Sequence, residues 1–202
     1  MDYNSSSNVD LLHLDSSNGN LLRLDLQQTL KRTPINPKDL TSFQRILLTT
    51  DGMVTEILEA CFWERMKVIK LFQDHFILDH GIPSLEIKKE CSVMQRKIFL
   101  RGRLSQKNHL YGDSIIVPDR LDEKIRDGLL NSNKPIGLLI FENRLETFRE
   151  ILDCGKERAH DLADYFNIEK DDFLIFRTYR VIANHLPIML ITEKFPENGM
   201  EI

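Results

Sequence analysis

Residues 92–102 read SVMQRKIFLRG, a stretch whose apolar and polar side chains alternate as in a β-strand. Successive side chains of a strand point to opposite faces of the sheet, so residues two apart share a face. Met94, Arg96, Ile98 and Leu100 therefore lie together on a face that is otherwise apolar. This pattern places Arg96 on the side of the strand that faces the core.

A second strand, residues 187–196 (PIMLITEKFP), carries one charge in the same way. One face of this strand carries Met189, Ile191, Glu193 and Phe195. Glu193 is the only polar residue on that face. Burying an unpaired charge costs several kcal/mol or more. Each of the two inward charges therefore needs a partner.

The pair Arg96 and Glu193 has two interpretations, and alternation leaves both open. In the first, they pair with each other or with other buried groups as a structural ion pair. In the second, one face of the sheet carries a dry pocket, in which the arginine fork binds a ligand carboxylate and the glutamate receives a ligand hydroxyl. Such a pocket fits a small molecule with these two groups at its opposite ends.

The rest of the chain reads as helices first and then consecutive strands with short connections. This order predicts an α+β fold with an antiparallel β-sheet. The predicted helices are a segment capped by Thr41 or Ser42 and residues 53–61, 121–131 and 156–166, and the predicted strands are residues 65–76, 93–101, 110–117, 173–182 and 188–195. Residues 134–137 are predicted as a turn, residues 183–185 as a hairpin turn, and residues 145–152 fit either a helix or a strand.

The 202 residues suit one domain with an N-terminal extension. Residues 1–36 are rich in Ser and Asn, so we predict a flexible extension there and a compact domain over residues 37–202. The formal net charge of -4 provides no global basic field, and we expect no nucleic-acid partner. An anionic substrate must then be bound by local arginines.

Three cysteines at distant positions, with no CxxC pair, favour a reducing compartment and argue against a zinc site. The sequence has neither a signal-peptide pattern nor an apolar run of about 20 residues, so we expect no membrane insertion and a cytoplasmic location, or the plastid stroma if the gene is plastid-encoded. Asp74, His75, Asp79 and His80 do not have the spacing of metal ligands, and we expect no metal there.

Several phrases of the sequence resemble the chorismate lyase (chorismate pyruvate-lyase) family. They run in the family's order from about residue 40 to residue 196, and the likeness is to the branch of cyanobacteria, plastids, archaea and mycobacteria. The phrases are TTDGMVTEILEACFWE (49–64), SVMQRKIFLRG (92–102), YGDSIIVP (111–118), NKPIGLLIF (133–141), RLETFREIL (144–152) and PIMLITEKFP (187–196).

This resemblance implies an enzyme that cleaves chorismate into 4-hydroxybenzoate and pyruvate without metal or cofactor, for quinone or other aromatic biosynthesis. It also implies an antiparallel sheet with helices that enclose a buried ligand pocket. By the resemblance, Arg96 binds the ring carboxylate, Glu193 contacts the ring hydroxyl, Met53 lines the pocket from a helical flap, and Ile136 supplies a backbone contact and part of the apolar wall. Arg96 and Glu193 are the two expected catalytic residues. We expect a monomer or a weak dimer.

The chain departs from the enteric branch of the family at Asp113, where that branch has an arginine that is a candidate for the second substrate carboxylate. Substitutes in this chain are Arg144, Arg149, Arg177 and Arg180. We predict Arg149, because it lies in the phrase RLETFREIL.

Two other classes of function stay open at this point. The same fold occurs as a non-catalytic, small-molecule sensor domain of bacterial transcription regulators. A structural interaction module, with Arg96 and Glu193 as an internal ion pair, is the third interpretation.

Overall fold

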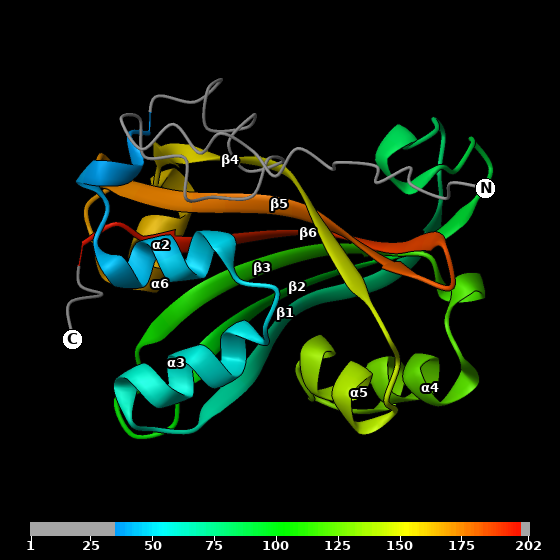
Figure 1. Cartoon of the computed structure of the whole chain (residues 1–202), viewed down its shortest axis with the longest axis horizontal. Helices are drawn as coiled ribbons and strands as arrows, with labels where there is room; N and C mark the ends of the chain where they lie inside the picture. Colours follow the sequence, from blue (N-terminus) through cyan, green and yellow to red (C-terminus); the bar gives the residue numbers. More distant parts are fainter. Residues whose placement is uncertain (1–34, 199–202) are drawn as a thin grey trace, which may run out of the picture.

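A computed structural model describes residues 35–198 of the chain. Six strands form one antiparallel sheet in the order β1-β2-β3-β6-β5-β4 (Figure 1). The strands are β1 (Met66–Ile77), β2 (Ser92–Gly102), β3 (Asn108–Ile116), β4 (Phe148–Arg158), β5 (Phe173–Ala183) and β6 (Leu186–Pro196). With the helices below, this confirms the predicted α+β class and its antiparallel sheet.

Four helices cover one face of this sheet, which we call the inner face. They are α2 (Ser42–Thr49), α3 (Val54–Phe62), α4 (Glu123–Asn131) and α5 (Ile136–Glu142). Their apolar residues, such as Leu47, Leu58 and Leu129, share one core with Met94 and Met189 of the sheet. The short helix α6 (Ala163–Phe166) packs on the other face, against Phe99, Tyr111 and Leu174 in a separate cluster.

Single-turn 3-10 helices occupy Pro37–Asp39, Pro83–Leu85, Pro118–Arg120 and His160–Leu162. Three of them begin with a proline, whose fixed φ suits a first helical turn.

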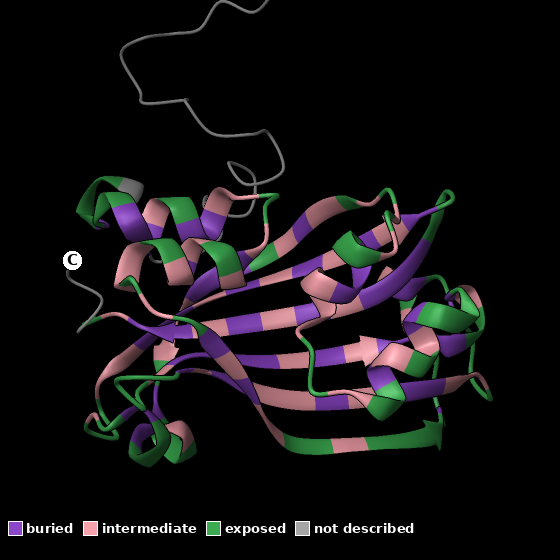
Figure 2. Cartoon of the chain, turned by 90° about the horizontal axis from the view of Figure 1, so that it is seen from below, coloured by how far each residue is buried: buried purple, intermediate pink, exposed green. Residues whose placement is uncertain are grey.

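The alternation predicted for the central strands is present along the sheet. In Figure 2 the strands show bands of buried and intermediate residues in turn. Met94, Arg96 and Leu100 are buried on the inner face, as are Met189 and Glu193 on β6. The direction predicted for both charges is therefore confirmed.

Local sequence explains two of the element boundaries. Thr41 caps α2 in a capping box with Gln44, as the cap prediction required. The β5–β6 hairpin turns at Asn184 and His185, both in the left-handed region (φ 50° and 63°), which matches the two-residue turn that suits twisted strands.

Two local predictions were wrong. Residues 134–137 are not all turn, because α5 begins at Ile136 directly after Pro135. Residues 156–158 end β4 rather than begin a helix, since they pair with β5 from Ile175 to Phe173. Pairing with a neighbouring strand outweighs the helix propensity of that segment. The segment 145–152, which fitted either class, enters β4 at Phe148.

Most of the predicted N-terminal extension, residues 1–34, lies outside the described residues. The division into residues 1–36 and 37–202 thus stays a prediction. Within residues 35–198, no helix is both long and apolar enough to cross a membrane.

Candidate functional site

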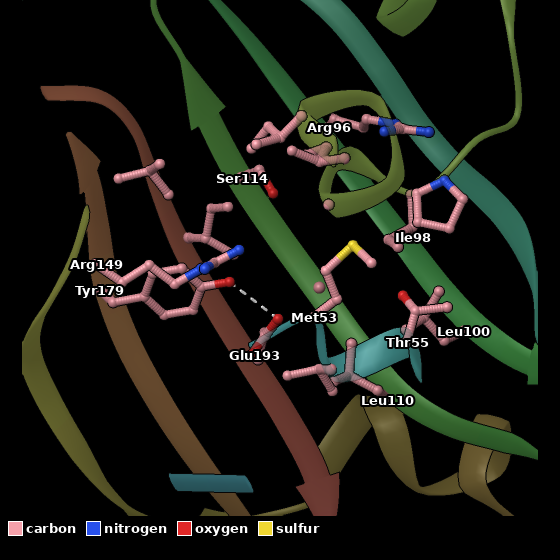
Figure 3. Close-up of a pocket in the computed structure, with 18 of the residues that line it drawn as sticks. Met53, Thr55, Arg96, Ile98, Leu100, Leu110, Ser114, Arg149, Tyr179 and Glu193 are labelled. Carbon is pink, nitrogen blue, oxygen red and sulfur yellow. Dashed lines mark hydrogen bonds between the residues drawn. The ribbon is translucent and has the colours of Figure 1, made fainter. Parts of the chain in front are cut away.

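A pocket lies on the inner face, between the sheet and the first residues of α3 and α5. Its empty volume is about 670 Å³, part of it open to solvent. The five residues predicted for the site come from five different parts of the chain, and all line the pocket: Met53, Arg96, Ile136, Arg149 and Glu193 (Figure 3, in which all but Ile136 are labelled). The structure therefore brings the predicted residues together, although their roles stay predictions.

Arg96 of β2 is a buried cation, 1% exposed, with few partners. Its Nη2 donates to the Lys134 carbonyl at 3.0 Å. Within residues 35–198, its Nε and Nη1 have no hydrogen-bond partner. Burial lowers the pKa of Arg96, but an arginine remains charged in proteins. Buried donors of a charged group are costly to leave unpaired, so this side chain is suited to receive an anion.

Glu193 of β6 is buried too, but its carboxylate has partners within the sheet. Oε2 accepts from Arg177 Nε at 2.7 Å, and Oε1 accepts from the Tyr179 hydroxyl at 3.0 Å. Strand β3 lies between β2 and β6, so Arg96 and Glu193 stand on opposite sides of it. The structural interpretation thus fits Glu193, which has Arg177 as its ion-pair partner, and does not fit Arg96.

The floor of the pocket is formed by β3, at Gly112 and Ser114. Gly112 pairs with Ile98 on one side and with Glu193 on the other, while Ser114 pairs with Arg96. A Cβ atom on Gly112 would lie 3.3 Å from Ile98 Cγ1. Because adjacent strands are about 4.8 Å apart, the backbones of β2 and β6 are roughly 10 Å apart, with a residue that lacks a side chain between them.

Met53 and Ile136 lie over this floor, at the starts of two helices. Met53 precedes α3, and its carbonyl accepts from the amides of Glu56 and Ile57. Ile136 is the first residue of α5. The two helix starts are in close contact, since a Cβ atom on Gly137 would lie 3.1 Å from Met53 Cγ. In Figure 3 the Met53 side chain lies between Arg96 and Glu193.

Arg149 reaches the pocket from β4, where it pairs with Val181. Its Nη1 donates to the carbonyl of Asp51, just before Met53. It is therefore the substitute arginine whose position agrees best with the prediction for the second carboxylate.

The other three arginine substitutes lie elsewhere. Arg177 is buried beside Glu193. Arg180 forms ion pairs with Glu150 at 2.5 Å and Glu86 at 3.1 Å. Arg144 is exposed after α5, in the left-handed region (φ 52°). Asp113, where the enteric branch has an arginine, accepts from Gln95 Nε2 at 3.0 Å.

Sequence reasoning missed Tyr179 and the pairing of Arg177 with Glu193. Burial and the Glu193 carboxylate together raise the pKa of Tyr179, so its hydroxyl keeps its proton and donates. The signal was present, because Arg177, Tyr179 and Val181 alternate along residues 173–182 in the same way as the two strands discussed above.

The family model for chorismate pyruvate-lyase, Rv2949c-like, matches residues 48–201. The chain belongs to this family. Among curated relatives, the chorismate pyruvate-lyase of Mycobacterium leprae is 31% identical over 175 residues, which are 83% of this chain and 80% of that protein. The chorismate pyruvate-lyase of Mycobacterium tuberculosis is 30% identical over 160 residues, 75% of this chain and 78% of that protein. The resemblance read from the sequence is confirmed, and it supports a lyase at family level.

Solved structures share the fold of this family member at low sequence identity. PhnF from Mycobacterium smegmatis aligns with a TM-score of 0.59 at 12% identity, over 75% of this chain and 67% of that chain. A GntR-family transcriptional regulator from Enterococcus faecalis aligns with a TM-score of 0.51 at 12% identity, over 67% of this chain and 96% of that chain. At this identity the likeness concerns the fold alone.

The arrangement in this chorismate pyruvate-lyase family member offers two different polar ends and an apolar middle. At one end is a buried guanidinium with two donors that no described residue pairs with, and at the other a carboxylate that two neighbours hold in place. Ile98, Leu100, Leu110 and Ile191 are among the apolar lining residues. Chemically, this can bind a flat molecule with an anionic group at one end and a hydrogen-bond donor at the other.

Proposed function

We propose that this protein is a lyase that cleaves chorismate into 4-hydroxybenzoate and pyruvate in the pocket above β3. The observation that carries the proposal is Arg96, which lies buried in this pocket with two nitrogen donors that no described residue satisfies. Family membership supports the choice of chorismate among small carboxylates.

In this proposal Arg96 binds the ring carboxylate, and Glu193 accepts a hydrogen bond from the ring hydroxyl. Met53 and Ile136 pack against the ring from the helical side. Arg149 binds the carboxylate of the enolpyruvyl group. Two cations thus match the two carboxylates of the substrate. Glu193 accepts the hydrogen bond of the ring hydroxyl and so fixes which end of the ring faces β6.

The reaction is an elimination that makes the ring aromatic. The bond between the ring carbon and the enolpyruvyl oxygen breaks, the hydroxyl-bearing carbon loses its proton, and the enolpyruvate takes up a proton to become pyruvate. The proton goes either to Glu193 or directly to the departing group. Because the ring is already one elimination from aromatic, a site that orients it and stabilises the developing charge is sufficient, and the proposal includes no metal or cofactor.

The test is to incubate the full chain with chorismate and to measure both products. Pyruvate is followed through the oxidation of NADH by lactate dehydrogenase, and 4-hydroxybenzoate by chromatography. The proposal requires the two products in equal amounts, with loss of activity in Arg96→Met. Binding of chorismate without turnover would favour a non-catalytic sensor instead, and the absence of binding would favour a structural module. The 4-hydroxybenzoate would supply quinone or other aromatic biosynthesis.

A further inference from the structure

Arg177 is a fully buried charged residue that does not line the pocket surface. It lies on β5 directly across from Glu193 and is 0% exposed. Its Nε donates to Glu193 Oε2 at 2.7 Å, its Nη1 donates to the Thr50 carbonyl at 2.9 Å, and its guanidinium lies 4.9 Å from the centre of the Tyr179 ring. It therefore contacts Glu193 from β5, and it does not cover the part of Glu193 that lines the pocket.

The contacts of Glu193 fix the direction of its carboxylate. Each of its two oxygens accepts one hydrogen bond from β5, from Arg177 at Oε2 and from Tyr179 at Oε1. A carboxylate oxygen has two lone pairs, so both oxygens keep an acceptor site after these bonds are made. Since Glu193 lines the pocket, a ligand hydroxyl can use them.

The charged groups around Glu193 include one cation in direct contact and several more distant groups. A carboxyl group buried among apolar side chains tends to keep its proton unless a cation is close. Arg177 is the cation in contact with it. The other charged or titratable groups on the surrounding elements are Tyr179 on β5, Arg149 on β4, Asp51 before α3, and Arg96 across the pocket on β2.

Burial alone would lower the pKa of Arg177, but the nearby carboxylate of Glu193 raises it overall, so the cation is retained. Tyr179 offers a neutral hydroxyl, which stabilises a carboxylate without balancing its charge. Arg177 thus supplies the cation and one of the two hydrogen bonds that fix the direction of the carboxylate.

We propose that Arg177 is a positioning residue that keeps Glu193 ionised and holds its carboxylate toward the pocket as the acceptor for the substrate hydroxyl. The role of Glu193 toward the substrate rests on the proposed function. The effect of Arg177 on the ionisation of Glu193 can be measured without substrate. A purely structural ion pair would also move the Glu193 titration when Arg177 is replaced, because an opposite charge in contact favours the ionised carboxylate. It would leave the pH dependence of turnover unchanged, so turnover is the readout that separates the two roles.

The experiment is an NMR titration of protein labelled with 13C at the glutamate carboxyl carbons. The Glu193 signal is the one that Glu193→Gln lacks. In Arg177→Gln, which keeps a hydrogen-bond donor but no charge, the titration midpoint of Glu193 should rise by about one to three pH units. Arg177→Lys, which keeps the charge, should stay within about half a unit of the native protein, because one opposite charge remains near the carboxylate.

Arg180→Gln is the matched control, since Arg180 lies on the same strand and pairs with Glu150 and Glu86. It should leave the Glu193 midpoint in place. Arg177→Met replaces Arg177→Gln if the latter does not fold. An unchanged Glu193 midpoint in the neutral Arg177 variants would overturn the proposal.

Turnover of chorismate gives the second readout. In Arg177→Gln the acid limb of the profile of kcat against pH should move upward with the NMR midpoint, so that activity is lost at low pH and recovered at high pH. An equal loss at every pH would count against a positioning role. If the native protein does not cleave chorismate, the proposed function fails, while the NMR titration still decides what Arg177 does to Glu193.

Discussion

Glu193 and Arg177 face each other across the β5–β6 ladder, with 2.7 Å between Oε2 and Nε. Arg96, the other buried charge of the pocket, has no carboxylate partner within residues 35–198 and donates only to the Lys134 carbonyl. The two buried charges predicted from alternation thus differ in their partners. Glu193 is balanced by the protein, whereas Arg96 is suited to be balanced by a ligand.

Replacing Arg96 should separate binding from stability. Arg96→Met removes a buried cation with two donors that have no partner within residues 35–198. We therefore expect the free energy of unfolding to stay the same or to rise by about 1–3 kcal/mol. Affinity for 4-hydroxybenzoate should fall by about 1.5–3 kcal/mol, roughly ten- to a hundredfold. Urea unfolding and calorimetric binding measure the two effects. A large loss of stability with unchanged affinity would mean that Arg96 has a structural role.

Replacing Glu193 should have the opposite effect on stability. Glu193→Ala leaves Arg177 buried without its partner, which should cost about 3–5 kcal/mol of unfolding free energy. Glu193→Gln keeps the shape of the side chain, so its turnover of chorismate is the cleaner readout and should fall strongly while the protein stays folded. Circular dichroism at the assay temperature provides the control. Full activity in folded Glu193→Gln would remove Glu193 from the site.

Filling the floor of the pocket should block the ligand. A side chain at Gly112 points between β2 and β6 on the inner face, and its Cβ atom already approaches Ile98 at 3.3 Å. Gly112→Val should cost about 1–3 kcal/mol in overpacking and weaken binding of 4-hydroxybenzoate at least tenfold or so. Asp113→Asn, one residue along and on the other face, should bind normally. Native affinity in Gly112→Val would place the ligand elsewhere.

The buried side chain of His109 should make the free energy of unfolding depend on pH. His109 stacks on Phe62 at 4.1 Å, and its Nε2 lies 3.7 Å from Glu64 Oε1. Burial lowers the pKa of His109, although the Glu64 carboxylate opposes this effect. The unfolded chain therefore takes up this proton at a higher pH than the folded protein does. The free energy of unfolding should then fall as the pH drops below about 6.5.

Urea unfolding between about pH 5 and 7.5 measures the slope of the free energy of unfolding against pH. This range spans the ordinary histidine pKa of about 6.5. His109→Gln should flatten it. His75→Gln, at an exposed side chain, serves as the control. An equal slope in the native protein and in His109→Gln would assign the pH dependence to other groups.

The sequence was sufficient for the parts of the site that depend on local periodicity. Arg96 and Glu193 could be placed on the inner face because a strand repeats every two residues whatever surrounds it. The same rule would have placed Arg177 and Tyr179 on the inner face of the sheet. Their hydrogen bonds, however, depend on which residues of β5 and β6 lie opposite each other. That register depends on the turn at Asn184 and His185 and on the shift in pairing between Val181 and Ile182.

Predictions failed where contacts between distant segments decide the structure. Residues 156–158 belong to β4 because β5 is available to pair with them, which no local pattern reveals. The start of α5 at Ile136 brings Gly137 against Met53, a contact between helices that are far apart in the sequence. Met53, Ile136 and Arg149 entered the site through the family resemblance, and their place in the pocket could not be derived from periodicity.

The most direct test of the account is a crystal structure of the protein with 4-hydroxybenzoate bound. We predict the ring above Gly112, its carboxylate about 2.7–2.9 Å from the Arg96 guanidinium, and its hydroxyl in hydrogen-bond contact with Glu193. A ligand bound in the reverse direction, with its hydroxyl at Arg96, or bound outside this pocket, would contradict it.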